Sequence, residues 1–365
     1  MRKKLLVILS AVCLITSVFV GCSKGENITT NNKAASASIK QEETQAKYSG
    51  EKGRISVYLS GPANMIKELE NAFEKDRGDV LEIYHAGCGP LRQKIWTEVE
   101  AGNIHADVFF GSNPLIYHAL KEKGALENYV SKHSEALKEE YKVGDGFFTL
   151  VNARYEVLVY DKGNISKEDA PKSYEDLKDS KWKDKIAYTD ISQSSTALAL
   201  TTGLWDLTGQ NMSFFEGLKA NNTLVVAKSK EVADKIQSGE IGAGITAYDA
   251  VASINKKAKK EGFESNLGIM WPKEGAIRLE RPIAIMKNDA RPEENTKLAK
   301  EFVDFMLSPE GQKITVKYNF FSVRNDVEVP KGAPSDIKYK TIDWESVSKH
   351  EKTIRDDFKK VMLGN

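Results

Sequence analysis

The sequence has 365 residues, 29% of them charged, and its 53 lysines and arginines nearly balance its 52 aspartates and glutamates, for a formal net charge of +1. This balance gives no electrostatic reason to expect binding to nucleic acid or to an anionic membrane surface. The three cysteines form no CxxC pair, which argues against a thiolate metal site or a redox motif.

The N-terminus has the pattern of a secretory signal. A basic start at residues 2–4 is followed by an apolar run at residues 5–20 and then by Gly21 and Cys22. The run is shorter than the roughly 18 to 20 apolar residues that a membrane-spanning helix needs. A cysteine directly after a small residue resembles a bacterial lipobox, although Phe19 stands where that motif usually has leucine. We therefore expect a lipoprotein signal peptide over residues 1–21; a plain secretory signal and an uncleaved anchor are the alternatives.

Cleavage before Cys22 would leave a lipidated cysteine as the new N-terminus, on the outer face of the cytoplasmic membrane. It would remove three basic residues and no acidic ones, so that 50 positive charges face 52 negative ones and the net charge is −2. Cys88 would be the only free thiol, so no internal disulfide could form. Residues 22–53 are polar and lack large apolar side chains, which predicts a disordered tether before a folded part that begins near Arg54.

Three strand–turn–helix units follow Arg54. β-rich runs at residues 54–60, 80–84 and 107–110 each lead through a turn that contains glycine to apolar residues at helical spacing. The helices are expected at residues 62–78, 90–100 and 114–123. This alternation predicts an α/β fold with a mostly parallel sheet and helices on its faces. Each turn lies at the carboxyl end of a strand, the edge of an open α/β sheet where ligands bind.

Two β-rich stretches without helices, at residues 147–161 and 267–287, interrupt the alternation. We interpret them as two crossover strands that connect two lobes. The first lobe would comprise residues 54–153 and 280–365, and the second residues 154–279. Two lobes joined by two crossing strands form a hinge and a cleft.

The second lobe has strand–helix units of its own. Its strands are predicted at residues 185–188, 224–227 and 241–246. One helix runs from Thr196 to about Leu207, one ends near Gly239, and one begins at Tyr248. A helix at residues 292–307, with apolar residues at helical spacing, would then rejoin the first lobe.

Five segments, in this order, are similar to bacterial extracellular solute-binding proteins of the two-lobed type II kind (family 1), which serve ABC importers. They are ISVYLSGPANMIKELENAF (residues 55–73), ADVFFGS (106–112), APKSYEDLKDSKWKDKI (170–186), GEIGAGITAYD (239–249) and FMLSPEGQKITVKYNFFSV (305–323). The resemblance implies a binding protein and not an enzyme, without a cofactor, which captures a small solute and meets an ABC permease. We expect a monomer. The likeness is greatest to the branch that includes ferric-iron, phosphonate, sugar-phosphate and thiamine binders.

Twelve candidate ligand-binding residues lie on the turns of both lobes. They are Ser60, Gly61, Asn64, Cys88, Gly89, Ser112, Asn113, Ser194, Ser195, Thr196, Tyr248 and Asp249. The amino end of a helix presents unpaired N–H groups and a partial positive charge, which suit a phosphate or a carboxylate. The alternative is that the serines and asparagines only cap their helices.

Several of these side chains have a second interpretation. The glycines that flank Cys88 allow close backbone approach, so the cysteine needs only to be small; a reactive thiol is the alternative. Tyr248 could donate to an oxyanion, bind ferric iron as tyrosinate, or belong to the core. His85 is either a ligand or an ordinary exposed histidine. Arg154 and Arg278, on the two crossings, could balance an anion, although lone arginines are more often solvated or paired.

The turns rich in serine and glycine favour an oxyanion, since neutral donors can bind phosphate by many hydrogen bonds. Iron-binding relatives typically have two adjacent tyrosines where this chain has Tyr248 and Asp249, and their first loop often supplies a histidine that SGPAN lacks. We therefore favour an organic phosphate or phosphonate, with no metal. The alternatives are ferric iron, a thiamine-type cation held by Trp205 or Trp271, a structural lipoprotein, and a secreted hydrolase, for which no known signature motif is present.

Overall fold

The computed structural model describes residues 49–364 except 112–113, 144 and 193. These residues belong to one compact unit, Gln45–Asn365. Cys22, the predicted signal peptide, most of the predicted tether, Ser112 and Asn113 lie outside the described residues. Within the described part, no helix is long and apolar enough to cross a membrane.

The first lobe is built from the three predicted strand–helix units. Its strands are β1 (Ile55–Leu59), β2 (Leu81–His85) and β3 (Val108–Phe110), and its helices are α1 (Ala63–Glu74), α2 (Cys88–Glu100) and α3 (Pro114–Glu122). β1 lies between the other two strands and pairs in parallel with both. The apolar stripe of α1, which includes Met65, Leu69 and Phe73, is buried. The helical spacing of these residues therefore predicted their burial.

The second lobe repeats the arrangement, with β5 between two parallel partners. Its strands are β5 (Ile186–Thr189), β6 (Leu224–Val226) and β7 (Ala243–Ala247), and its helices are α4 (Ser195–Leu207), α5 (Ser213–Ala220), α6 (Ser229–Gln237) and α7 (Tyr248–Lys260). Single-turn 3-10 helices occur at Ser134–Ala136, Glu139–Tyr141, Glu175–Lys178 and Ser180–Trp182.

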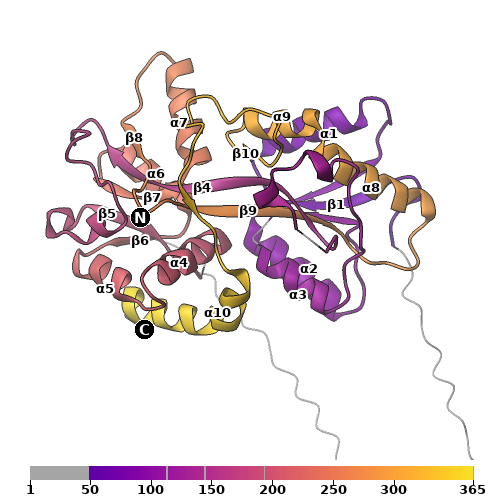
Figure 1. Cartoon of the computed structure of the whole chain (residues 1–365), viewed down its shortest axis with the longest axis horizontal. Helices are drawn as coiled ribbons and strands as arrows, with labels where there is room; N and C mark the ends of the chain where they lie inside the picture. Colours follow the sequence, from indigo (N-terminus) through magenta and orange to yellow (C-terminus); the bar gives the residue numbers. More distant parts are fainter. Residues whose placement is uncertain (1–48, 112–113, 144, 193, 365) are drawn as a thin grey trace, which may run out of the picture. The chain divides into compact units, whose positions relative to one another are not determined.

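Two long strands join the lobes, β4 (Thr149–Asp161) and β9 (Ala276–Ile285). They pair antiparallel with each other, and β9 also pairs with β3 while β4 pairs with β7 and with β8 (Leu267–Met270). The strand order is therefore β2-β1-β3-β9-β4-β7-β5-β6, with β4 and β9 across the middle (Figure 1). The predicted two-lobed α/β fold with two crossover strands is confirmed.

After β9 the chain continues with two helices beside α1 of the first lobe. α8 (Glu293–Leu307) and α9 (Pro309–Lys317) pack there, and the rings of Phe73 and Phe302 meet edge to face with centroids 5.1 Å apart. β10 (Phe321–Ser322) then pairs with β4, and β11 (Tyr339–Lys340) with β9. Of the predicted tether, Glu51 and Gly53 are hydrogen-bonded to the side chain of Asn295 on α8.

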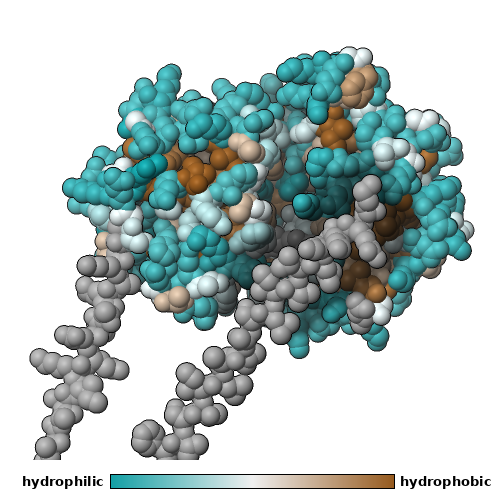
Figure 2. Space-filling view, turned by 180° about the vertical axis from the view of Figure 1, so that it is seen from behind, coloured by the Kyte–Doolittle hydropathy of each residue, from teal (hydrophilic) through white to brown (hydrophobic). Residues whose placement is uncertain are grey.

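The C-terminal helix α10 (Trp344–Phe358) continues into a π-helical turn at Lys359–Leu363. Its buried side chains, Val347, Ile354 and Phe358, belong to the core that contains α4 and α5 of the second lobe. The prediction assigned residues 280–365 to the first lobe, whereas this apolar stripe packs on the second. Hydrophilic residues predominate on the face seen in Figure 2, with apolar patches between them.

Candidate functional site

A buried arginine on β9, Arg281, forms hydrogen bonds that connect the first turn of the first lobe to the crossing strands. Arg281 Nη2 donates to the carbonyl oxygen of Ser60 at 2.5 Å and to its Oγ at 3.3 Å. Arg281 Nη1 lies 3.5 Å from Oδ1 of Asn152 on β4. A register shift between Leu150 and Asn152 marks a β-bulge at this position, a feature that often re-aims side chains near functional sites.

The positive charge of Arg281 has no carboxylate partner among the ion pairs of the described residues. Its side chain is 5% exposed and lies between the rings of Phe110 and Phe320, 4.7 and 4.8 Å from their centroids. Burial lowers the pKa of Arg281. A buried charge is costly unless it is paired, and ring faces offset only part of that cost. The site therefore has a buried positive charge that an anionic ligand would neutralise.

Two buried polar atoms lie on the same face of the crossing strands. Asn152, Arg154 and Glu156 alternate along β4 and so share one face, and Asn152 is the register partner of Arg281. In the described part of the chain, Asn152 Nδ2 and Glu156 Oε1 are buried without a hydrogen-bond partner. Because buried polar groups are nearly always bonded, Asn152 Nδ2 is a donor that a ligand could use.

The two arginines noted in the sequence are both paired. Arg154 forms a bidentate pair with Asp249 of α7, with Nε and Nη2 each 3.0 Å from a carboxylate oxygen. Arg278 pairs with Glu280 at 3.0 Å and stacks between Tyr141 and Tyr339. Sequence reasoning did not single out Arg281. Its spacing of three from Arg278 puts the two on opposite faces of β9, but only the fold reveals which face meets the turns.

Three predicted residues of the first lobe gather at Arg281. Cys88 Sγ, at the start of α2, lies 3.2 Å from Ser60 Oγ, and His85 Nε2 lies 2.9 Å from the carbonyl oxygen of Gly61. Gly111, at the end of β3, has a φ of +95°, and a Cβ there would lie 2.2 Å from Ser60 Oγ. Ser60, Gly61 and Cys88 are thus brought together.

The other predicted residues are more dispersed. Asn64 is exposed on the first turn of α1, whose N-cap, Pro62, makes no side-chain cap bond. Ser194 caps α4 by accepting from Ala197 N at 3.1 Å, and Ser195 and Thr196 form the first turn of that helix.

Tyr248 is 3% exposed among aromatic rings, with centroids 5.5 Å from Trp271 and 5.4 Å from Phe321. Burial raises its pKa. Tyr248 thus belongs to an aromatic cluster and also lines a groove between α7 and α9. The described residues contain no group of three or more His, Cys, Asp or Glu side chains arranged to hold a metal ion.

A cavity of about 510 Å³ lies between α2 and α3 of the first lobe, Ile191, Ser192 and Ser194 of the second lobe, and α10. Gly89, Ser192 and Ser194 line it. Its volume is in the range of small-molecule sites. α10 therefore supplies a wall to a cavity that both lobes border.

An ion pair to the first lobe and a hydrogen bond to the second hold α10 beside this cavity. Glu351 on α10 pairs with Arg92 of α2 at 3.2 Å and with Arg355 at 2.8 Å, and Arg355 Nη1 donates to the carbonyl oxygen of Ile191 at 3.2 Å. Burial acts to raise the pKa of Glu351, but the two arginines outweigh it and the pKa is lowered. Glu351 thus joins the first lobe to a helix that packs on the second.

Glu351→Gln is expected to loosen the lobes, because it removes the charge that holds Arg92 and Arg355 together, at a cost of about 1–3 kcal/mol. The radius of gyration of the unliganded chain, measured by small-angle X-ray scattering, should increase. Glu345→Gln is the matched control, since among the described residues Glu345 forms an ion pair only with Lys349 of the same helix, at 2.8 Å, and both are exposed. Equal radii for the two variants would contradict a tie between the lobes.

Glu156 should make stability depend on pH. Burial raises the pKa of Glu156 to about 7, from an ordinary value of 4.5. The folded state then binds more protons than the unfolded state between these values, so stability falls as pH rises from about 4.5 to 7. Glu156→Gln should remove this loss, on the order of 3 kcal/mol, and raise the melting temperature at pH 8. The melting temperature, measured from pH 5 to 8, tests this dependence. Glu168→Gln, at an exposed position, is the control. If the two variants had the same pH profile, Glu156 would not be the group responsible.

Comparisons with known proteins connect this geometry to a family. Residues 103–350 match the family model described as "Bacterial extracellular solute-binding protein". A putative 2-aminoethylphosphonate-binding periplasmic protein of Salmonella typhimurium is 24% identical over 279 residues, which are 74% of this chain and 76% of the relative. The major ferric iron-binding protein of Neisseria gonorrhoeae is 24% identical over 263 residues, 71% of this chain and 77% of the relative.

Solved structures share the fold. Iron-bound HitA from Pseudomonas aeruginosa has a TM-score of 0.72 at 21% identity, covering 84% of this chain and 99% of that one. The periplasmic binding protein AfuA from Actinobacillus pleuropneumoniae, with fructose-6-phosphate bound, has a TM-score of 0.73 at 24% identity, covering 86% and 99%. At these identities the likeness establishes the two-lobed fold.

Proposed function

This chain belongs to the bacterial extracellular solute-binding proteins and is therefore a binding protein, not an enzyme. We propose that it captures a small organic phosphate or phosphonate between its lobes for uptake through an ABC importer. The observation that carries the proposal is the buried guanidinium of Arg281, which lies beside Ser60 and Asn152 and has no carboxylate partner among the described residues. A phosphoryl group would supply the missing negative charge and could accept from Asn152 Nδ2. The amino end of α2 lies beside Ser60 and offers further N–H donors.

Capture works by closure. The solute binds between the lobes, contacts groups from both, and so favours the closed state over the open one in proportion to its differential affinity. The first lobe contributes Ser60, Gly61 and the start of α2. The second lobe contributes the start of α4, where Ser195 and Thr196 present backbone N–H groups. The closed form then delivers the solute to the permease.

Ferric iron is the second candidate, because iron-binding proteins are among the relatives. Two features of this chain favour the anion. Asp249 is occupied by a bidentate pair with Arg154, and Tyr248 packs among Trp271 and Phe321. A hard cation prefers anionic oxygen donors, whereas the charge at the centre of this cluster is positive.

We further propose that Cys22 carries lipid and holds a monomeric receptor on the outer face of the cytoplasmic membrane, with residues 23–48 giving it reach to its permease. Labelling with a radioactive or clickable fatty acid in the producing bacterium tests this step. Incorporation should be lost in Cys22→Ala, and undiminished labelling of that variant would rule the anchor out.

A thermal-shift screen tests the solute class. The panel contains 2-aminoethylphosphonate, sugar phosphates, inorganic phosphate, thiamine, and ferric iron with and without an anion. A solute at 100 times its dissociation constant should stabilise the chain by about 2.7 kcal/mol. We expect a phosphonate or organic phosphate to give the largest shift. Stabilisation by ferric iron alone, with a visible tyrosinate absorption band, would overturn the proposal in favour of an iron binder.

A further inference from the structure

A groove lined by α7 and α9 lies on the opposite face of β4 from Arg281. Its volume is about 950 Å³. Tyr248, which lines it, packs on Trp271 and Phe321, the same two rings that meet Tyr155 of β4. Tyr155 alternates with Arg154, so the two point to opposite faces of the strand. The groove is therefore separate from the candidate solute site.

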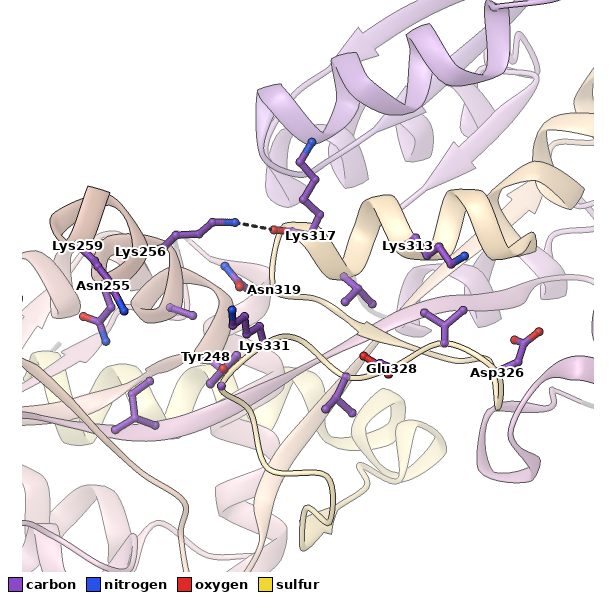
Figure 3. Close-up of a pocket in the computed structure, with 16 residues that line it drawn as sticks. Tyr248, Asn255, Lys256, Lys259, Lys313, Lys317, Asn319, Asp326, Glu328 and Lys331 are labelled. Carbon is purple, nitrogen blue, oxygen red and sulfur yellow. Dashed lines mark hydrogen bonds between the residues drawn. The ribbon is translucent and has the colours of Figure 1, made fainter. Parts of the chain in front are cut away.

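The groove has walls from both lobes. One wall is α7 of the second lobe, the other is α9 of the first, and residues 326–332 close the remaining side (Figure 3). Two bonds bridge the walls: Lys256 Nζ donates to the carbonyl oxygen of Lys317 at 3.5 Å, and Asn319 Nδ2 donates to Ser253 Oγ at 3.0 Å. An occupant of this groove would contact both lobes at once.

The rim is basic. Lys256 and Lys259 on α7, Lys313 on α9 and Lys331 after β10 line the groove, and none of them takes part in an ion pair with a described carboxylate. A fifth lysine, Lys317, is paired with Glu68 at 2.7 Å.

The acidic residues of the lining do not balance this charge. Asp326 is held by Arg324, at 2.7 and 2.8 Å, and Glu328 is the other carboxylate. The groove therefore has an excess of positive charge that the chain itself leaves uncompensated.

The floor is apolar. It is continuous with the core cluster around β4, α6 and α7, and it is formed by Tyr248, Ala252, Ile269, Val316, Val327 and Val329. The lysines are spread along the groove and do not converge on one point (Figure 3). A compact oxyanion needs converging donors, so this arrangement suits an extended ligand that carries several negative charges and apolar groups between them.

We propose that this groove binds an acidic peptide segment of a partner protein, with apolar side chains on the floor and carboxylates at the rim lysines. Charge complementarity selects the partner and speeds encounter, and the apolar floor supplies the buried area. The groove lies between α7 of one lobe and α9 of the other. The affinity for the bound segment therefore depends on the relative position of the lobes, and hence on their closure. This proposal does not depend on which solute the cleft binds.

The test uses the full chain and a fluorescein-labelled octapeptide in which glutamate alternates with leucine. Fluorescence anisotropy at low salt should show saturable binding. A peptide with glutamine in place of every glutamate should bind at least about tenfold more weakly, since it keeps the apolar side chains and loses the charge.

Two variants with the same change in net charge locate the site. The groove variant is K256E/K259E/K313E/K331E. The control is K75E/K167E/K183E/K352E, at exposed lysines outside the groove. The groove variant should lose at least about tenfold in peptide affinity, and the control should stay within about threefold. Circular dichroism checks that both are folded.

Three results would overturn the proposal: equal losses in the two variants, equal binding of the glutamine peptide, or binding to phosphatidylglycerol vesicles without binding to the peptide. The solute-induced thermal shift is measured on the same groove variant. A preserved shift with no peptide binding in the wild type rejects the groove and leaves the proposed solute site standing. Peptide binding without any solute-induced thermal shift supports the groove and rejects the proposed solute site.

Discussion

Arg281→Met is expected to abolish solute binding while the unliganded chain stays folded. The variant removes the positive charge that we propose pairs with the phosphoryl group, and binding should weaken at least about 100-fold, or by about 3 kcal/mol. Methionine is unbranched and adaptable, so it can fill the space between the rings of Phe110 and Phe320. Removing a buried, unpaired charge also offsets part of the loss of the bonds to Ser60. Titration calorimetry and thermal unfolding measure the two effects.

Arg278→Met is the matched control on the same strand. Arg278 is as buried as Arg281, but it is paired with Glu280 at 3.0 Å on the opposite face. Its removal leaves the carboxylate of Glu280 buried and should destabilise the chain by about 3–5 kcal/mol. Solute binding should persist in the folded fraction. The assignment of Arg281 fails if both variants lose solute affinity equally, or if Arg281→Met binds like the wild type.

Gly111→Ala is expected to have the second largest effect, because the turn after β3 has no room for a side chain. The new Cβ would lie 2.2 Å from Ser60 Oγ and 3.0 Å from Arg281 Nη2, at a φ of +95°. Ser60 would have to move away from Arg281 and Cys88. We expect a loss of about 2–4 kcal/mol in the free energy of unfolding, together with weaker solute binding. Urea denaturation and calorimetry report on the two.

Gly124→Ala separates backbone strain from steric collision. Gly124 also has a positive φ, +68°, but a Cβ there meets no atom within 4 Å. This substitution should cost about 1 kcal/mol and leave solute affinity unchanged. If Gly111→Ala behaved like Gly124→Ala in both measurements, close packing at Ser60 would not be needed for the site.

The fold was predictable because its signals are local and repeated. Strand, glycine turn and amphipathic helix follow one another three times before Gly124. The first helix-free stretch coincides with β4, and the second contains both β8 and β9, of which β9 is the crossover strand. Each of these elements is determined by its own side-chain spacing. The family resemblance agreed with this pattern, and the match over residues 103–350 confirms it.

The candidate site was less predictable because it depends on which faces meet. Turn residues such as Ser60, Gly61 and Cys88 could be named from their position after a strand, and they do gather. Arg281 could not be named, because the sequence does not reveal which side of β9 faces the turns.

Ser194 and α10 illustrate the same limit. A serine before a helix can cap the helix, contact a ligand, or do both; Ser194 caps α4 and also lines the cavity beside α10, and its contact with a ligand stays a prediction. The packing of α10 on the second lobe rests on contacts with residues 140 or more positions away along the chain, such as those between Phe358 and Phe215. No local pattern in the sequence reports such a partner.

The two faces of the crossing strands have different chemistry. One presents Asn152, Arg154 and Arg281 to the turns of the lobes, and the other carries the aromatic cluster beneath the lysine-rimmed groove. β4 and β9 connect both regions, so a change in the angle between the lobes would alter the cleft and the groove together. Closure of the lobes on a solute would thus change the shape of the groove and its affinity for the proposed peptide.

We propose that Arg281 marks the binding site of an anionic solute. A crystal structure of the chain with the solute that gives the largest thermal shift tests this assignment. We predict a phosphoryl or phosphonyl group between the lobes, with an oxygen within hydrogen-bond distance of Arg281 and of Asn152 Nδ2. A solute bound away from Arg281, or a ferric ion coordinated by Tyr248, would contradict it.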